Sequence, residues 1–183
     1  MIVGLKQNRT AKDKSMANYS INGMEYRTES LVLREVTEND LAEVARTWPS
    51  DRPLSGTEVQ AQIARMRETH KRNAAGNLLH LCLAVCEQAD PGKIRGWCGL
   101  DGSRSPSAPE IFVLLDEAFR NRGYGTQCMK ELLRIAVEEY GLHTVRGGCY
   151  KDNIASARAM EKAGMVHCGS EDNGDPRFEY TEE

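Results

Sequence analysis

One short segment of the chain combines basic side chains and glycines at a spacing that suits an anion. Arg120-Asn121-Arg122-Gly123-Tyr124-Gly125-Thr126 lies between an apolar segment and a long amphipathic one, so we expect it to join a strand to the N-terminus of a helix. Free amides and the helix dipole attract anions there, and glycines let a ligand approach the backbone. Arg120 and Arg122 add formal positive charge. The segment indicates a pyrophosphate-binding loop.

Two other phosphate motifs do not fit this segment. A dinucleotide-binding G-x-G-x-x-G would need a third glycine where Cys128 stands, and no Gly-Lys-Ser/Thr marks a P-loop. Taken alone, the segment is also compatible with a glycine-lined turn that carries surface arginines, because such spacing arises by chance. We therefore do not expect nucleotide hydrolysis, and the surrounding elements must decide what the segment does.

The elements around this loop are those of a sheet covered by helices. Ile111–Leu115 is apolar without polar alternation, which predicts a central strand covered on both faces. A helix is predicted from about Thr126 to Tyr140, and Gly141 ends it. Its inward stripe comprises Cys128, Met129, Leu132, Leu133, Ala136 and Val137. After it we predict a strand at 143–149, a helix at 154–162, and strands at 165–168 and 178–180.

The first half of the chain predicts two helices and three strands. A strand at 31–36 leads into Thr37-Glu38-Asn39-Asp40, which has the pattern of a capping box for a short helix. A second helix is predicted at 57–71. Strands at 79–86 and 94–100 flank Asp90-Pro91-Gly92, a turn tripeptide, and predict an antiparallel hairpin. The fold class is therefore α/β (α+β), with helices on both faces of the sheet.

Length and composition limit the class of protein. The 183 residues are 40% hydrophobic and 28% charged, which is enough for one core, so we expect a single domain at 19–183 behind a polar, flexible tail at 1–18. The longest apolar run, Leu78–Cys86, is too short to cross a bilayer. The N-terminus lacks the apolar region of a signal peptide. We therefore expect a cytoplasmic protein without a membrane partner.

The charge of the chain argues against nucleic acid as a partner and leaves a cationic acceptor open. The net charge is only −3 and forms no basic stripe, so we expect no binding to nucleic acid. Residues 170–183 carry six acidic side chains against Arg177, a net −5. This end is either a solvated surface or an acidic rim that favours a cationic acceptor.

The cysteines and histidines do not predict a metal site or a disulfide framework. Six cysteines stand at 82, 86, 98, 128, 149 and 168, in apolar segments of a chain without secretory features. We expect reduced thiols in the core. No Cys-x-x-Cys occurs, and the four histidines lack paired ligand spacing. We expect no metal.

The order of these motifs resembles the GNAT acyltransferase superfamily. The strand at 110–115 is followed by Arg120-x-x-Gly123-x-Gly125-Thr126 and, about thirty residues later, by Asn153-x-x-Ser156 and Glu161-Lys162-Ala163-Gly164-Met165. The likeness covers roughly residues 28–180. The opening Thr28–Arg34 and Pro109-Glu110-Ile111 are most similar to the branch that contains the ribosomal-protein N-terminal alanine acetyltransferases.

The resemblance implies a mostly antiparallel sheet of six to seven strands, splayed in the middle, that binds acetyl-CoA or another acyl-CoA. It implies that the backbone of Val113, Leu114 and Leu115 pairs with the pantetheine arm and that Arg120 and the loop at 121–126 hold the pyrophosphate. Asn153 and Ser156 would contact the thioester end, or cap the helix, or do both. The amide near Leu114 would polarise the thioester carbonyl.

The acyl acceptor implied by the resemblance is a primary amine, either a protein α-amino group or a small amine. Glu110 matches a position where some members keep a general base, and a solvent-facing carboxylate is the alternative. Two positions depart from the family: Gly148 stands where some members have a base, and Met160 where many have a tyrosine acid. Tyr150, Tyr124 or water would then protonate the thiolate.

Two further hypotheses remain beside an N-acetyltransferase. A non-catalytic module that binds acyl-CoA would explain Gly148 and Met160, and it would release no thiol with any amine. A regulatory interaction protein would use the basic tail or the acidic end as a docking surface. Nothing in the sequence identifies the acceptor or the oligomeric state.

Overall fold

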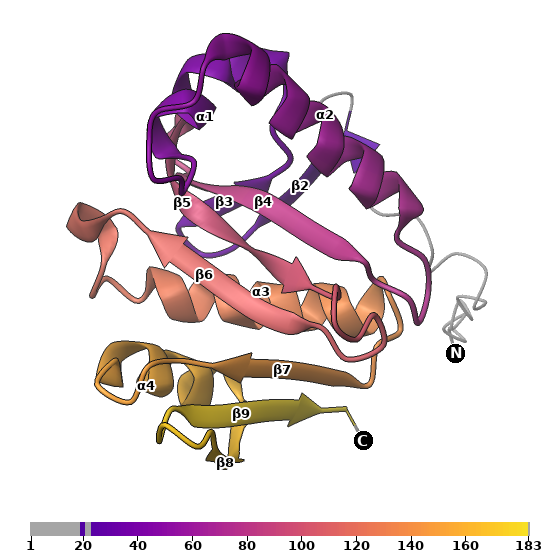
Figure 1. Cartoon of the computed structure of the whole chain (residues 1–183), viewed down its shortest axis with the longest axis vertical. Helices are drawn as coiled ribbons and strands as arrows, with labels where there is room; N and C mark the ends of the chain where they lie inside the picture. Colours follow the sequence, from indigo (N-terminus) through magenta and orange to yellow (C-terminus); the bar gives the residue numbers. More distant parts are fainter. Residues whose placement is uncertain (1–18, 21–22, 183) are drawn as a thin grey trace, which may run out of the picture.

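The computed structural model describes residues 19–20 and 23–182, which form one mixed sheet with helices on both faces (Figure 1). The strands are β1 (Tyr19–Ser20), β2 (Gly23–Arg27), β3 (Leu31–Arg34), β4 (His80–Glu87), β5 (Asp90–Asp101), β6 (Glu110–Leu115), β7 (Thr144–Gly148), β8 (Val166–Ser170) and β9 (Pro176–Thr181). The helices are α1 (Leu41–Thr47), α2 (Gly56–Arg72), α3 (Tyr124–Glu138) and α4 (Ile154–Ala163). The tail predicted at 1–18 lies outside the described residues.

The sheet confirms the predicted fold class and extends the predicted strand count. The strand order is β1-β2-β3-β4-β5-β6-β7-β9-β8, and every neighbouring pair is antiparallel except β6 with β7. Six to seven strands were expected, whereas the sheet has nine. The additional strands are β1 and β2, and in β2 Met24 and Tyr26 are buried while Glu25 and Arg27 are not. This alternation is a strand signal that the prediction overlooked.

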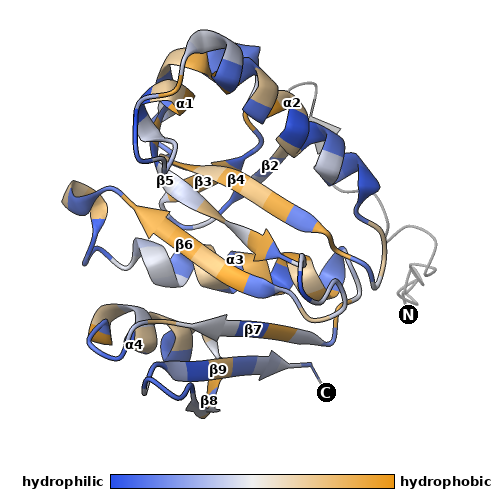
Figure 2. Cartoon of the chain, viewed as in Figure 1, coloured by the Kyte–Doolittle hydropathy of each residue, from blue (hydrophilic) through white to orange (hydrophobic). Residues whose placement is uncertain are grey.

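Two core clusters lie on the two sides of the sheet. On one side α1 and α2 pack on β4 and β5 through Val44, Val59, Ile63, Met66 and Trp97. On the other side α3 and α4 pack through Cys128, Leu132, Ile135, Ala136 and Met160. Figure 2 shows β4 and β6 as strongly apolar strands and a much more polar β7 and β9. The sheet is therefore buried at its centre and more polar toward its C-terminal end.

The first two helices begin as the sequence indicates. The hydroxyl of Thr37 accepts from a backbone amide while Asp40 reaches back to the Thr37 amide, which is the predicted capping box; it caps a short 3-10 helix, Glu38–Asp40, that leads directly into α1. Ser55 and Glu58 form a second capping box at the start of α2. Together they fix where both helices enter the face above β4 and β5.

The β4–β5 hairpin is confirmed, but its turn was predicted at the wrong residues. The turn is Gln88–Ala89, and Asp90 already pairs with Glu87 in the ladder. The pairing then slips between Cys86 and Glu87, so that Ile94 stands opposite Cys86. Pro91 and Gly92 lie in this irregularity, where the missing amide of proline does not interrupt a regular ladder.

The strand β6 is less covered than its apolar sequence predicts. Ile111 is buried, but Leu114 is 48% exposed, so the prediction that both faces are covered is wrong. The reason is the next strand: β6 and β7 share a single registered pair, Glu110 with Arg146, and then diverge (Figure 1). This confirms the expected splay in the sheet. Beyond that pair, the β7-facing edge of β6 has no strand partner within the described residues.

The third helix buries five of the six residues of the predicted inward stripe, but Val137 is only partly buried and Ile135, which was not predicted, is buried. The helix ends at Glu138, and Gly141, with φ +59°, follows two residues of turn. It begins at Tyr124 rather than Thr126, because Gly123 is its N-cap with φ +79°.

None of the helices in the described part of the chain is long and apolar enough to span a bilayer.

The cysteines follow the prediction in part. Cys82, Cys86, Cys98 and Cys128 are buried free thiols. Cys149 is only partly buried and Cys168 is exposed, so these two are not core thiols as expected. Both belong to the more polar end of the sheet, where α4 covers one face only.

Candidate active site

The loop before α3 presents an uncovered helix N-terminus. Asn121 and Gly123 both have positive φ, 59° and 79°, which turns the chain sharply into the helix. A Cβ atom at Gly123 or Gly125 would meet no described atom within 4 Å. The first turn of α3 contains no acidic residue. The loop therefore leaves free amides and open space for an anion.

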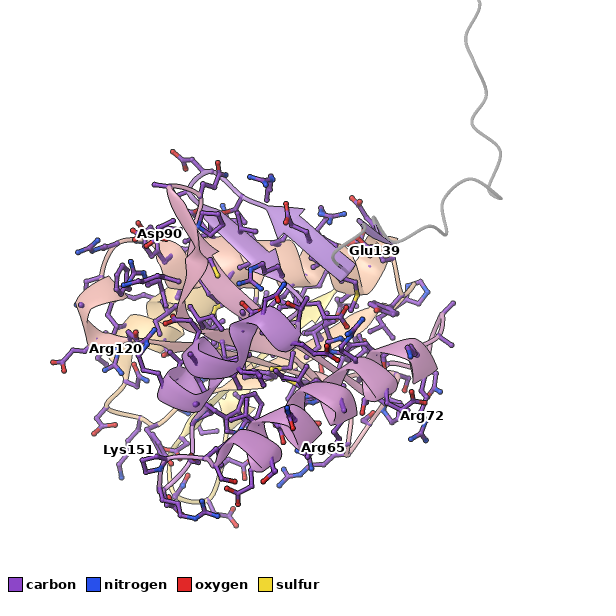
Figure 3. All side chains as sticks on the ribbon, turned by 90° about the horizontal axis from the view of Figure 1, so that it is seen from above. Arg65, Arg72, Asp90, Arg120, Glu139 and Lys151 are labelled. Carbon is purple, nitrogen blue, oxygen red and sulfur yellow. The ribbon has the colours of Figure 1, made fainter. Side chains whose placement is uncertain are left out.

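The arginines of this loop are held by neighbouring groups. The Nε of Arg120 donates to the backbone oxygen of Leu115 at 3.0 Å. The guanidinium of Arg122 lies 5.1 Å from the Phe119 ring centroid, and Arg95 lies on the same ring at 4.5 Å. Figure 3 shows Arg120 extending from the edge of the molecule, at the same end as Lys151. Arg95 and Arg122 both lie within 4 Å of Glu87, at 3.7 and 3.9 Å, so part of the positive charge beside the loop is paired.

Tyr124 does not reach the reacting end of the predicted site. Its hydroxyl donates to Oε1 of Glu87 at 2.9 Å, on the far side of the loop from α4. Of the two tyrosines considered as proton donors, Tyr150 alone lines the cleft described next, as far as the described residues go.

A cleft of about 450 Å³ opens where β6 and β7 diverge. It brings together six of the predicted residues, which come from β6, from the loop after β7 and from α4: Glu110, Val113, Leu114, Tyr150, Asn153 and Ser156. Two of them expose large apolar surface, Leu114 at 48% and Tyr150 at 75%. Exposed apolar groups in a cleft indicate a ligand that covers them.

Asn153 and Ser156 combine both roles that the sequence left open. The Asn153 side chain accepts from the Ser156 amide at 3.1 Å and so caps α4. Both residues also line the cleft. The cap fixes the orientation of the Asn153 amide group, so that its nitrogen is available to a ligand.

Cys149 lies in the same cleft but is not built as a nucleophile. Its Sγ lies 3.7 Å from the backbone oxygen of Asn153. Burial, with help from the negative charge of Asp175, raises the pKa of the Cys149 thiol. A thiol that is held protonated is a poor nucleophile, which argues against a covalent acyl-cysteine.

Glu110 stands at the mouth of the cleft, at the start of β6. Its Oε1 lies 3.7 Å from Nη1 of Arg177 and 3.9 Å from Nη1 of Arg104. The side chain is 42% exposed, so a water or an amine can reach the carboxylate. Its cross-strand neighbours are Asp101 on β5 and Arg146 on β7.

Arg177 is the main site residue that the sequence analysis missed. A Cβ atom at Gly148 would lie 3.1 Å from Nη1 of Arg177, so the absent side chain at 148 makes room for this guanidinium. Arg177 also pairs with Glu171. Because β9 rather than β8 lies beside β7, Arg177 is placed next to a residue of β6 that precedes it by 67 positions. No short motif carries that information.

The turn between β8 and β9 forms the remaining wall of the cleft. The backbone amide of Lys151 donates to Asp175 at 2.9 Å, and Nζ of Lys151 donates to the Asn173 oxygen at 3.3 Å. Asp175 and Pro176 line the cleft beside Arg177. The turn is therefore fixed to the loop that carries Tyr150, and the cleft is preformed.

Met160 cannot serve as a proton donor, and its surroundings explain why it is apolar. It is 2% exposed, and its Sδ lies 2.9 Å from the position of a Cβ on Gly147. It fills the space between α4 and β7 beside Met165.

Within the described residues, no group of three His, Cys, Asp or Glu side chains is placed to hold a metal ion.

This fold and cleft define a known class of protein. Residues 30–166 match the family model described as acetyltransferase (GNAT) domain, which confirms the resemblance seen in the sequence. The chain therefore belongs to the GNAT acetyltransferases, a family of acyltransferases whose cosubstrate is acetyl-CoA.

Individual relatives agree with this assignment. The uncharacterized N-acetyltransferase YnaD of Bacillus subtilis is 32% identical over 56 residues, which is 31% of this chain and about a third (33%) of that relative. The ribosomal-protein-S5-alanine acetyltransferase of Vibrio fischeri superposes with a TM-score of 0.72 at 16% identity, covering 86% of this chain and 96% of that one. RimL, a ribosomal L7/L12 α-N-protein acetyltransferase in complex with coenzyme A, gives 0.62 at 16% identity, covering 84% and 95%. At these identities the two structures show a shared fold.

Proposed function

We propose that the protein transfers the acetyl group of acetyl-CoA directly to an α-amino group, at the N-terminus of a peptide or protein. The observation that carries this proposal is the cleft between β6 and β7. It joins Glu110, the open edge of β6 and the α4 cap in one space. The uncovered N-terminus of α3 follows the end of β6 along the chain and does not itself line the cleft. Together these features suit a long ligand with a phosphate end and an acyl end.

The chain offers groups to the pantetheine arm and to the pyrophosphate of acetyl-CoA. The open edge of β6 at Val113 and Leu115 offers backbone groups to the amides of the pantetheine arm, in the manner of an added strand, whereas the backbone groups of Leu114 between them face β5. Asn121, Arg122 and Thr126, with the glycines between them, offer amides and charge to the pyrophosphate, and Arg120 adds a cation nearby. The cosubstrate supplies the activated acetyl group.

Three groups of the chain have assigned roles in the transfer. The carboxylate of Glu110 takes the proton of the incoming ammonium, directly or through water. The backbone amide near Leu114 donates a hydrogen bond to the acetyl oxygen. The hydroxyl of Tyr150, which lines the cleft and is exposed, gives a proton to the departing thiolate. Because a thiol with a pKa near 8.5 leaves readily, one donor is sufficient.

The kind of amine follows from the energy of deprotonation. At neutral pH, making a lysine-like amine neutral costs about 4.6 kcal/mol, whereas an α-amino group costs only about 1–1.4 kcal/mol. The second family base is absent because Gly148 stands at its position. A site with a single, partly exposed carboxylate therefore suits the less basic α-amino group.

An acceptor screen tests this proposal. Purified protein is given acetyl-CoA with amidated peptides that begin with Ala, Ser, Met or Gly, and with Nα-acetyl-lysine amide and spermidine as the other amine classes. Thiol release and product mass are measured. We expect mono-acetylation of the α-amine in at least one peptide, and little or none of the lysine or spermidine. Turnover confined to lysine or spermidine would contradict the proposed acceptor.

A second candidate is a non-catalytic module that binds acyl-CoA, and the buried Met160 at the usual acid position favours it. The same screen separates the two functions when calorimetry accompanies it. If acetyl-CoA binds but no reaction releases thiol above background, the protein is a non-catalytic module that binds acyl-CoA.

A further inference from the structure

A second groove, of about 390 Å³, lies beside the catalytic cleft on the face of the sheet opposite α4. It crosses four neighbouring strands, from Glu110 on β6 over Arg146 on β7 and Glu179 on β9 to Cys168 and Gly169 on β8. It shares three lining residues with the cleft: Glu110, Glu171 and Arg177. The groove and the cleft are therefore continuous, and they meet at the carboxylate that takes the proton.

We propose that this groove binds the first residues of a peptide acceptor, so that the substrate is the N-terminus of an extended polypeptide rather than a small amine. This inference rests on the proposed function. The cosubstrate occupies the cleft from the α3 side, so the amine must approach Glu110 from the other opening. The groove across β7, β9 and β8 is the continuation of the site on that side.

The dimensions of the groove set the length of the segment that it holds. Three strand-to-strand steps separate β6 from β8, and at about 4.8 Å each they span about 14 Å. An extended chain advances about 3.3–3.6 Å per residue, so about four residues fill this distance. A lone amino acid or a small polyamine would leave most of the groove empty.

The chemistry of the groove also suits a peptide N-terminus. Three carboxylates, of Glu110, Glu171 and Glu179, face two guanidiniums, of Arg146 and Arg177. The excess of negative charge favours a protonated α-ammonium as it enters. Arg146 pairs with Glu179 at 3.3 Å and both are more than a third exposed, so they can exchange partners with backbone groups of an acceptor.

The far end of the groove lies at an edge strand, where another polypeptide backbone can approach. β8 is the last strand in the sheet order, with β9 as its neighbour. Its pairing slips between His167 and Gly169, which leaves Cys168 in a bulge, and Gly169 has open space where a Cβ would stand. Bulges and glycines at an edge strand permit close approach by another backbone.

The test compares acceptors of increasing length that share one N-terminal residue: the amino acid amide and the amidated dipeptide, tetrapeptide and octapeptide. For the natural sequence we expect kcat/KM to rise about tenfold from the amide to the tetrapeptide and then to level off. The reason is that the binding energy of the residues behind the N-terminus helps to stabilise the transition state at the reacting amine. A flat series, or a rise that continues to the octapeptide, would overturn the four-residue groove.

Two substitutions locate the effect. Cys168→Trp places a bulky ring in the groove from the exposed bulge, and Arg146→Ala removes its central cation. In both variants we expect the ratio of tetrapeptide to amide kcat/KM to fall to about one. Glu161→Trp, on the exposed side of α4, is the matched control and keeps the ratio. An unchanged ratio in both groove variants overturns the proposal, whereas no turnover of any α-amine, even the amide, would contradict the proposed function itself.

Discussion

The Nη1 atom of Arg177 lies 3.7 Å from Oε1 of Glu110, in the space that a side chain at Gly148 would occupy. These residues come from the ninth, sixth and seventh strands, which the sheet order makes close neighbours. The guanidinium also pairs with Glu171 and so links the β8–β9 turn to the start of β6. The proposed base therefore has its position fixed by a residue on another strand.

Glu110→Gln tests the role of the carboxylate itself. The substitution keeps the shape of the side chain and removes the proton acceptor, so we expect kcat to fall about 100- to 1000-fold. Acetyl-CoA affinity, measured by calorimetry, should be unchanged. Glu117→Gln, in the exposed turn before α3, is the control. A kcat within about twofold of the natural protein would show that solvent serves as the base.

Arg177→Met tests the positioning of Glu110. The methionine keeps much of the apolar stem and removes the ion pairs, so the carboxylate is no longer held at the mouth of the cleft. We expect kcat to fall about tenfold, with the KM for acetyl-CoA little changed and with partial recovery in Arg177→Lys. Arg158→Met, on the exposed side of α4, is the matched variant. An equal loss in Arg177→Met and Arg177→Lys would indicate a packing role for Arg177 instead.

Much of the fold and part of the site were predictable from sequence. The capping residues Thr37 and Asp40 and the glycine that starts α3 act through neighbours in the chain, and local patterns reveal such contacts. The order of strands β7, β9 and β8 depends on distant pairing, and with it the place of Arg177. Leu114 was misjudged for a related reason: its apolar side chain indicates burial, but here it lines a cleft.

Arg34 and Asp40 form a bidentate ion pair, with bonds of 2.9 and 2.7 Å, that ties β3 to the start of α1. Burial raises the pKa of Asp40, but the hydrogen bonds from Arg34 and Thr37 outweigh burial and hold that pKa below its usual value. The native state therefore takes up this proton at a lower pH than the unfolded chain does. The stability that the pair contributes is present above about pH 4 and is lost as the pH falls below that value.

Asp40→Asn tests this pH dependence through urea unfolding from pH 7 to pH 2.5. Near neutral pH we expect a loss of about 1.5–3 kcal/mol, because the bonds of the carboxylate to a cation and to an amide are weakened. Below pH 4 the difference from the natural sequence should shrink. The exposed Asp51→Asn is the control. A difference that stays constant across this range would contradict the account.

His70 and Glu35 form a buried pair between α2 and the segment after β3. Nε2 of His70 accepts from the Cys82 amide at 3.1 Å, which places the ring proton on Nδ1, where Glu35 accepts it at 2.8 Å. His70→Ala leaves both partners unsatisfied, so we expect a loss of about 3–5 kcal/mol in the free energy of unfolding. Chemical denaturation measures it, with the exposed His143→Ala as control. A loss near 1 kcal/mol would mean that water replaces the ring.

The central claim is that the N-terminus of α3 holds the pyrophosphate of the cosubstrate, and two glycines allow a matched test of it. Gly125 and Gly56 both lie in the first turn of a helix, have open space at the Cβ position and lack a positive φ. Leucine at either position therefore leaves folding intact, which the melting temperature verifies. We predict that Gly125→Leu weakens acetyl-CoA binding at least about 100-fold in a calorimetric titration, while Gly56→Leu does not change it. Equal affinity in the natural protein and in Gly125→Leu would contradict the account.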